Sequence, residues 1–518
     1  MDKELLQRLI DWSTGTPRPP YKANLEVTRR CNLSCKGCWQ PTDTYRFDEE
    51  MSLALIERAV NEALGMGVKE WNLIGGEPFC RVDVMQSLIG RIKRGGARGE
   101  VTSNGTLLDE SLVELLVDSG WDTVRLSLDC PDPSTHDHLR GVKGAFDRTY
   151  RTLETFARVK ARLNAESPRI EIFMVLTPDN YRDLARMVEL AGDVGATKIG
   201  VQPLNLFSDF EGNVVEGGRD LKFGWRDARR LRKEIRSAKE LADRLLIENT
   251  IGDLLERDLV RKTERMDEVI LEDVADLEDD FFALPCFEPW YFISIRPNGN
   301  VVPCARHMIV DSDKGGSKPF SLYEQSLEAI WVGEGFAKVR RDLMTRNMPK
   351  YCQECCVTQV THSRVLRAGI YRCQGNLDNA VKVYTHGLKS NTGQENLWLG
   401  MGSCYQDLGR FVEAARCHRN VVRINPNQPW GWYSLGDCLR EGGENEEALA
   451  CFRKVLTIPS SEQTVYFLAH RMIGEILRKQ GDPEAALEHY RLALEQGGDD
   501  DFILTEIDKC KEMLGGRG

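Results

Sequence analysis

The sequence predicts an α/β protein: a partial (βα)6 barrel, then a small β-hairpin domain and an all-α repeat solenoid. Three observations support this prediction. Six short β-type runs alternate with helical stretches over residues 22–205, two cysteines flank a hairpin pattern at 286–304, and a 34-residue period runs through 361–500. Strands that alternate with helices indicate βα units around a parallel sheet.

The six predicted strands lie at 22–28, 70–74, 99–102, 122–128, 169–176 and 197–202. In parallel barrels the functional residues gather at the carboxyl ends of the strands. Here those ends are followed by a cysteine loop, a pair of glycines and several hydrogen-bonding side chains. We therefore expect one edge of the sheet to carry the chemistry.

The cysteine loop follows the first predicted strand. Cys31, Cys35 and Cys38 form a C-x3-C-x2-C triplet in CNLSCKGC. Such a triplet can hold three irons of a [4Fe–4S] cluster, which leaves the fourth iron without a protein ligand. A small molecule can chelate that open iron; taken alone, the triplet is also compatible with a zinc site.

Gly75-Gly76-Glu77-Pro78 follows the second predicted strand. With the cysteine triplet and the six βα units, this GGEP run makes residues 22–205 resemble the radical S-adenosylmethionine (SAM) superfamily. The resemblance implies that SAM chelates the open iron. It also implies that SAM is cleaved reductively to methionine and a 5′-deoxyadenosyl radical, which abstracts a hydrogen atom from a substrate.

The same resemblance assigns the SAM contacts. Gly75, Gly76, Glu77 and Pro78 are expected to receive the amino group of SAM, Ser103, Asn104 and Ser127 its ribose or carboxylate, and Arg140 its carboxylate. Gly37 stands where the family usually has an aromatic residue before the third cysteine. We expect Trp39, or backbone alone, to place the adenine.

Cys130 closes the fourth predicted strand in SLDCP, where related sequences usually have glycine. A thiol at this position could return a hydrogen atom to a substrate radical, as in radical epimerases. The alternative is a partly buried spectator thiol.

A second cysteine group begins at residue 286. Cys286 and Cys304 flank an alternating run with an Asn-Gly turn, typical of a β-hairpin, and Cys352 and Cys355 form a C-x2-C pair. The arrangement is similar to the SPASM or twitch extension of radical SAM enzymes, which implies an auxiliary [4Fe–4S] cluster on these four thiols. Cys356 could replace Cys355, and a four-cysteine zinc site is the alternative.

The C-terminal residues repeat with a period of 34, as in the spacing of Gly375, Gly409 and Gly443 and of Trp398 and Trp432. This period is the tetratricopeptide signature. It predicts about four helical hairpins over 361–500 and a capping helix from Asp501. Stacked helix pairs form an extended surface that usually holds a polypeptide; the alternative is that the repeats dimerise or brace the enzyme.

The cysteines at equivalent repeat positions, Cys404 with Cys438 and Cys417 with Cys451, are expected to be small buried apolar residues. The predicted organisation is an N-terminal segment 1–21, a radical SAM core 22–207, a bridging helical segment 208–285, an auxiliary cluster domain 286–360, repeats 361–500, and a capping helix with tail 501–518.

Composition narrows the classes of function. The 518 residues carry a net charge of −11, which argues against general nucleic-acid binding. No apolar run reaches membrane-spanning length, and the charged N-terminus lacks the apolar core of a signal peptide. Sixteen cysteines with open cluster motifs favour a reducing cytoplasm over a disulfide framework.

Three functions compete. The first is a radical SAM maturase that modifies a peptide or protein held by the repeats, by oxidation, cross-linking or epimerisation. The second is a radical SAM oxidase, dehydrogenase or epimerase of a small molecule such as a sugar, lipid or cofactor precursor. The third is a metal-braced repeat scaffold without enzymatic activity. Both enzymes would need a low-potential electron donor of the flavodoxin or ferredoxin type.

Overall fold

The computed structural model describes residues 2–38, 50–204, 223, 227–254, 281, 284–304, 320–347, 357–390, 393–459, 463–497 and 501–515. The chain forms two compact units, residues 1–366 and 367–518. This division is coarser than the six predicted segments.

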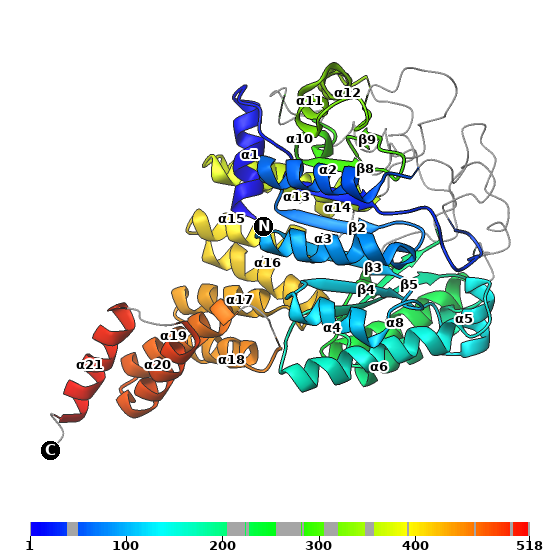
Figure 1. The fold of residues 1–518 in the computed structure, drawn as a ribbon. Coiled ribbons are helices and arrows are strands. Elements are labelled where there is room, and N and C mark those ends of the chain that lie inside the picture. The colour runs from blue at the N-terminus through cyan, green and yellow to red at the C-terminus, as the bar shows by residue number, and fades with distance from the viewer. Residues whose placement is uncertain are drawn as a thin grey trace. The chain divides into compact units, whose positions relative to one another are not determined.

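The first unit is built on one nine-stranded sheet in the order β7-β6-β5-β4-β3-β2-β1-β8-β9 (Figure 1). Its strands are β1 Lys22–Glu26, β2 Glu70–Ile74, β3 Arg98–Ser103, β4 Thr123–Ser127, β5 Arg169–Leu176, β6 Lys198–Pro203, β7 Glu248–Asn249, β8 Phe292–Ile295 and β9 Val301–Val302. All neighbouring pairs are parallel except β8 with β9. The six strands predicted from the sequence are therefore confirmed.

The sheet is held in register by a row of buried aliphatic side chains. Leu25 pairs with Leu73, Leu73 with Val101, and Val124 of the next strand with Ile170. These side chains are almost inaccessible to solvent. Because a slip of one residue would turn this row away from the core, the register is strongly specified, and the loops that follow the strands emerge at one edge.

Helices of the first unit are α1 Lys3–Ser13, α2 Leu53–Met66, α3 Val82–Arg94, α4 Glu110–Asp118, α5 Pro133–Arg140, α6 Ala145–Leu163, α7 Leu184–Asp193, α8 Ala228–Arg244, α10 Glu288–Tyr291, α11 Leu327–Val332 and α12 Glu334–Met344, with short 3-10 turns at Pro78–Arg81, Tyr181–Asp183 and Ile251–Leu254. Side-chain caps define several starts; Ser52, for example, accepts a hydrogen bond from the Leu55 N–H at the start of α2.

Two segments lie elsewhere than predicted. The hairpin β8–β9 is not a separate β unit, because β8 pairs in parallel with β1 and extends the barrel sheet. Helix α8, predicted as part of a bridge, packs on α7 and is followed by β7, which pairs with β6. It continues the βα pattern because Leu231, Ile235 and Ala238 give it a buried apolar stripe.

The second unit is helical. With α13 Val357–Cys373, which begins before its boundary, the helices are α14 Leu377–Ser390, α15 Glu395–Asp407, α16 Phe411–Ile424, α17 Pro429–Glu441, α18 Asn445–Val455, α19 Gln463–Lys479, α20 Pro483–Gly497 and α21 Asp501–Gly515. Consecutive helices from α14 onward pack on each other. Gly402, Gly436 and Gly474 are repeat positions where a side chain would overlap an aromatic or imidazole ring of the next helix, His418, Phe452 and Tyr490 respectively.

Candidate active site

The cysteine loop leaves the carboxyl end of β1. Cys31 and Cys38 are exposed and Cys35 is partly exposed. The Leu33 N–H lies 3.5 Å from the Cys31 sulfur, and the Cys38 N–H donates to the Cys35 carbonyl. Three accessible thiols thus lie within one short loop at the predicted edge.

The GGEP run is bound to the backbone that leads into this loop. The Gly76 N–H donates to the Thr28 carbonyl and the Glu77 N–H to the Arg30 carbonyl, each at 2.8 Å. A Cβ on Gly75 would overlap the Thr28 carbonyl oxygen, and one on Gly76 that of Arg30. The glycines are therefore required here by close packing of two protein segments.

Glu77 joins this run to the turn after β3. Its carboxylate accepts hydrogen bonds from the Ser103 hydroxyl (2.8 Å), the Asn104 N–H (2.7 Å) and the Phe79 N–H. The side chain is fully buried, and burial raises its pKa to about 7 although these hydrogen bonds favour the ionised form. Glu77 thus fixes Ser103 and Asn104 in place.

Asn104 reaches from β3 to the cysteine loop. Its Nδ2 donates to the Asn32 Oδ1 at 2.9 Å and lies 3.9 Å from the Cys31 sulfur. Its Oδ1 accepts from Thr106. Two of the residues predicted to contact SAM, Ser103 and Asn104, therefore lie in one network with a predicted cluster ligand.

The C-terminal end of α5 is hydrogen-bonded to the cysteine loop. Backbone N–H groups of Ser34 and Lys36 donate to the carbonyls of Arg140 (3.2 Å) and Leu139 (2.8 Å), respectively. Gly141, with φ of 71°, ends the helix, and a Cβ there would overlap the Ser34 carbonyl. These contacts bracket Cys35.

The Arg140 side chain also lies against the cysteine loop, beside Cys35. Its Nη1 lies 3.8 Å from the Cys35 sulfur, and its Nε lies 2.7 Å from Oδ2 of Asp129, without the alignment of a hydrogen bond. Burial alone would lower the pKa of Arg140, but Asp129 and the Cys35 thiol together raise it. The guanidinium is thus a buried cation beside a predicted cluster ligand.

Two other predicted residues stand apart from this network. Ser127 ends β4 and has no side-chain hydrogen bond among the described residues. Cys130 is fully buried, with its sulfur 3.6 Å from Oδ2 of Asp183 and its pKa raised by burial to about 12. This burial matches the spectator alternative; the hydrogen-donor role of Cys130 stays a prediction.

Three site features were missed from the sequence. Asp129 was not recognised as the partner of Arg140. Cys80 lies beside the cysteine loop, where burial raises its pKa and the Asn32 N–H counteracts that rise. Gly37 has a φ of 72° and faces the Leu204 side chain, so its backbone conformation requires glycine. Trp39 lies outside the described residues.

The loop residues fit a [4Fe–4S] cluster. Three thiols are accessible, and N–H groups of Leu33, Asn104 and Arg140 point at two of the sulfurs, as in the surroundings of thiolate-bound clusters. Within the described ranges no three Cys, His, Asp or Glu side chains surround a single metal-ion position.

The auxiliary site is described in part. Cys286 and Cys304 lie at the two outer ends of the hairpin segment, whereas Cys352, Cys355 and Cys356 lie outside the described residues. Burial is the main cause that raises the pKa of Tyr291, and both Cys286 and Cys304 contribute to the rise. The joint role of Cys286 and Cys304 as cluster ligands stays a prediction.

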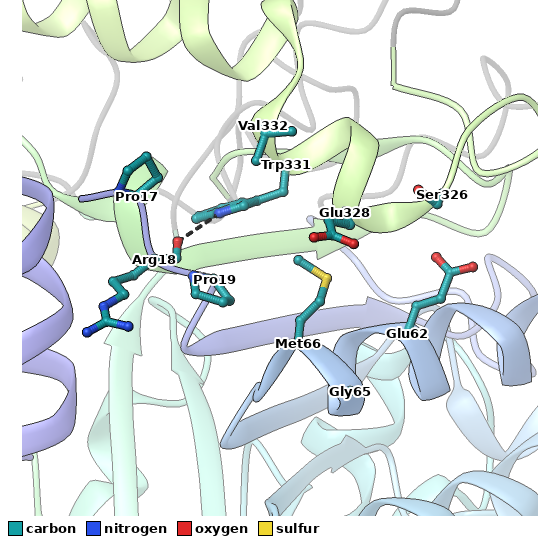
Figure 2. Close-up of a pocket in the computed structure, with 10 residues that line it drawn as sticks. All are labelled: Pro17, Arg18, Pro19, Glu62, Gly65, Met66, Ser326, Glu328, Trp331 and Val332. Carbon is teal, nitrogen blue, oxygen red and sulfur yellow. Dashed lines mark hydrogen bonds between the residues drawn. The ribbon is translucent and has the colours of Figure 1, made fainter. Parts of the chain in front are cut away.

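A pocket of about 570 Å³ lies beside the segment that leads into the amino end of β1 (Figure 2). It is lined by the segment 17–19 before β1, the end of α2 and helix α11, with Met66 and Trp331 among its apolar side chains and Glu62 and Glu328 among its charged ones. Trp331 is fixed by its indole N–H, which donates to the Arg18 carbonyl at 2.9 Å. None of the predicted site residues lines this pocket.

Comparison with protein families matches the chain in the predicted order. Residues 25–191 match the radical SAM superfamily, and 286–356 match an iron–sulfur cluster-binding domain of the SPASM type. Tetratricopeptide repeats match at 399–462 and 469–502. In the part of the chain that the structure describes, no helix has the length and apolar character needed to cross a bilayer.

Among curated proteins, the PqqA peptide cyclase of Xanthomonas campestris (strain 8004) is 27% identical over 351 residues, covering 66% of this chain and 80% of the relative. That of Granulibacter bethesdensis is also 27% identical, over 348 residues, covering 66% and 81%. Among solved structures, SuiB of Streptococcus suis bound to S-adenosylmethionine is 17% identical with a TM-score of 0.46, covering 65% of this chain and 72% of that one.

The order of the family matches is the one predicted from the sequence, and the thiol loop lies in the region that matches the radical SAM model. A radical SAM domain implies SAM and a [4Fe–4S] cluster, and the SPASM match implies auxiliary iron–sulfur binding. The chain is therefore an enzyme that carries a radical SAM domain, a SPASM-type iron–sulfur cluster domain and C-terminal tetratricopeptide repeats.

Proposed function

We propose that this enzyme modifies a peptide or protein by radical SAM chemistry and that the repeats hold the polypeptide. The observation that carries the proposal is the similarity, over the radical SAM and SPASM regions together, to curated peptide cyclases. A small-molecule enzyme would share the radical SAM core and would use the repeats only to dimerise or to brace the enzyme.

We propose that Cys31, Cys35 and Cys38 hold the SAM-cleaving cluster, and that Cys286, Cys304, Cys352 and Cys355 hold the auxiliary one. When bound, the first cluster supplies the electron that cleaves SAM to methionine and a 5′-deoxyadenosyl radical. A low-potential donor of the flavodoxin or ferredoxin type would provide that electron.

The residues of the sheet edge would position SAM. In the proposal Gly75–Pro78, Ser103, Asn104, Ser127 and Arg140 contact it. Glu77 does so through backbone alone, since its carboxylate is committed to Ser103, Asn104 and Phe79. The network that holds Ser103 and Asn104 would keep their polar atoms in one arrangement and reduce the reorganisation needed on binding.

Polar side chains link successive helix pairs of the repeats. Arg372 pairs with Asp407 of the next helix pair (2.5 Å), Gln406 donates to Asp437, and Arg478 pairs with Glu506 (2.5 Å). Beside this series, Trp430 and Tyr433 of α17 are half-buried aromatic side chains with ring centroids 5.7 Å apart. Half-buried aromatic residues are frequent anchors for bound polypeptides.

The substrate class can be tested by isotope transfer. Peptides translated from short open reading frames beside the gene would be prepared with deuterated side chains and α-carbons. They would then be incubated anaerobically with the reconstituted enzyme, SAM and dithionite. The proposal predicts deuterium in 5′-deoxyadenosine and a mass change of the peptide. Transfer from a small-molecule substrate, with none from any peptide, would contradict it.

The role of the repeats has a matched test. Trp430→Ala/Tyr433→Ala should raise the KM for the peptide at least about tenfold, because two aromatic contacts are lost. Val412→Ala is the control, because Val412 is an exposed apolar residue on α16, 67% accessible, and is not part of the apolar cluster on which Trp430 and Tyr433 pack. An unchanged KM in the double variant would indicate that these two residues do not hold the substrate.

A further inference from the structure

The Arg140–Asp129 pair lies beside one thiol of the cysteine loop and is largely removed from water. Arg140 Nη1 lies 3.8 Å from the Cys35 sulfur, and the Arg140 and Asp129 side chains are 12% and 7% exposed. Charges this far from solvent are weakly screened, so each acts strongly on its neighbours.

The pair is held rigidly from both ends. Asp129 accepts a hydrogen bond at its Oδ1 from the Val175 N–H (3.0 Å), and its carbonyl accepts from Asn180 Nδ2 (2.8 Å). Arg140 is fixed by the backbone contacts between the end of α5 and the cysteine loop. The Asp129 carboxylate and the Arg140 backbone are therefore both held beside the cysteine loop.

A cation beside a cluster thiolate stabilises the reduced cluster, which carries one more negative charge, and an anion has the opposite effect. Hydrogen bonds to the sulfurs, net charge and solvent exposure are the features by which a protein sets the potential of an iron–sulfur cluster. Arg140 and Asp129 place one charge of each sign at this position, with the cation nearer to Cys35.

We propose that the Arg140–Asp129 pair sets the reduction potential of the SAM-cleaving cluster through Cys35, with Arg140 raising it and Asp129 partly offsetting that rise. Both are positioning residues in this role. The proposal rests on the proposed cluster at Cys31, Cys35 and Cys38.

The test is a redox titration of the reconstituted full-length protein without SAM, with dithionite as reductant and electron paramagnetic resonance as readout. The relevant signal is the one lost in Cys31→Ala/Cys35→Ala/Cys38→Ala. Arg140→Gln should shift its midpoint to more negative values and Asp129→Asn to more positive values. Each shift should change the reduced-to-oxidised ratio at least about tenfold at fixed potential, which is 59 mV for a one-electron couple.

Two further variants control for general damage. Arg125→Gln removes a cation of β4 that is paired with Glu171 at 2.9 Å and lies four residues before Asp129, so it should leave the midpoint unchanged. Arg140→Lys keeps the charge and should shift less than Arg140→Gln. If Arg140→Gln does not load iron, Asp129→Asn and Arg140→Lys still decide the question.

Unchanged midpoints in Arg140→Gln and Asp129→Asn, or shifts of both in the same direction, would overturn the proposal. Failure of the wild-type protein to assemble a cluster on the triplet would instead contradict the proposed function. The two failures are therefore distinguishable.

Discussion

Two groups of cysteines in this chain differ in their access to solvent and in the N–H groups around their sulfurs. In the first unit, Cys31 and Cys38 are exposed on a loop, and N–H groups approach the Cys31 and Cys35 sulfurs. In the repeats, Cys404, Cys417, Cys438 and Cys451 are at most 6% exposed inside helices. A raised pKa does not separate the groups, because burial raises the pKa of these four thiols and also that of Cys31. Solvent access and nearby N–H donors, more than the number of cysteines, therefore distinguish a candidate cluster site from cysteines that only pack in a core.

The largest expected effect is on iron content. Cys31→Ala/Cys35→Ala/Cys38→Ala should lose about four irons per chain, because one cubane cluster no longer has ligands. Cys417→Ala/Cys438→Ala should lose none. Iron and sulfide assays on anaerobically reconstituted protein check both; equal iron in the two variants would remove the distinction between the groups.

The second effect concerns the glycines that let the cysteine loop approach its neighbours. Gly76→Ala and Gly141→Ala would each drive a methyl group into a backbone carbonyl, of Arg30 and Ser34 respectively. We expect a cost of at least about 3 kcal/mol and loss of cluster binding, since backbone cannot yield as a side chain can.

Gly65→Ala is the matched control for that prediction. Gly65 lies in α2 with nothing within 4 Å of its added Cβ, so the substitution should stabilise the protein by about 0.5–1 kcal/mol. Unfolding in urea and iron content measure both changes. Normal iron binding by Gly76→Ala would show that the close approach is not needed.

The third effect is on pH dependence. Burial raises the pKa of Glu77 from 4.5 to about 7, so the folded state binds the proton more tightly than the unfolded state does. This contribution to stability is fully present below pH 4.5 and is lost as the pH rises through 7, by at most about 3 kcal/mol. Glu77→Gln should remove that dependence.

Urea unfolding of the first unit between pH 5 and pH 8 provides the measurement for Glu77. A wild-type stability that changes with pH as much as that of Glu77→Gln would show that this carboxyl does not titrate in the range.

The smallest effect is on packing in the repeats. Cys438→Ala should cost about 1 kcal/mol through loss of a buried sulfur, and Cys438→Ser should cost more because its hydroxyl would be buried in an apolar site. Calorimetry should show lower Tm values for both, with unchanged iron content. Iron loss in Cys438→Ala would mean that a repeat cysteine takes part in metal binding.

The sequence predicted the features that depend on local pattern. Alternation and periodicity located the six central strands and the helix pairs, and spacing identified the cysteine triplet. Features formed by residues distant in the chain were not predicted: the pairing of β8 with β1, the Asp129–Arg140 ion pair, and the contact of Gly76 with Arg30. No local signal reports such contacts, because the fold alone brings these residues together.

Glu77 illustrates the same limit within the site. The GGEP run was predicted to receive the amino group of SAM. The structure shows that the glycines are close to the cysteine loop and that the Glu77 carboxylate binds the turn after β3. The GGEP motif therefore has a structural role: it holds the cysteine loop and the turn after β3 together at this edge of the sheet.

The most direct test of the central claim is formation of 5′-deoxyadenosine. Wild-type protein, Cys31→Ala/Cys35→Ala/Cys38→Ala and Cys417→Ala/Cys438→Ala would each be incubated anaerobically with SAM and dithionite, and the nucleoside quantified by mass spectrometry. We predict formation by the wild type and the repeat variant and none by the triplet variant. Equal formation by the triplet variant, or none by cluster-loaded wild type, would contradict the account.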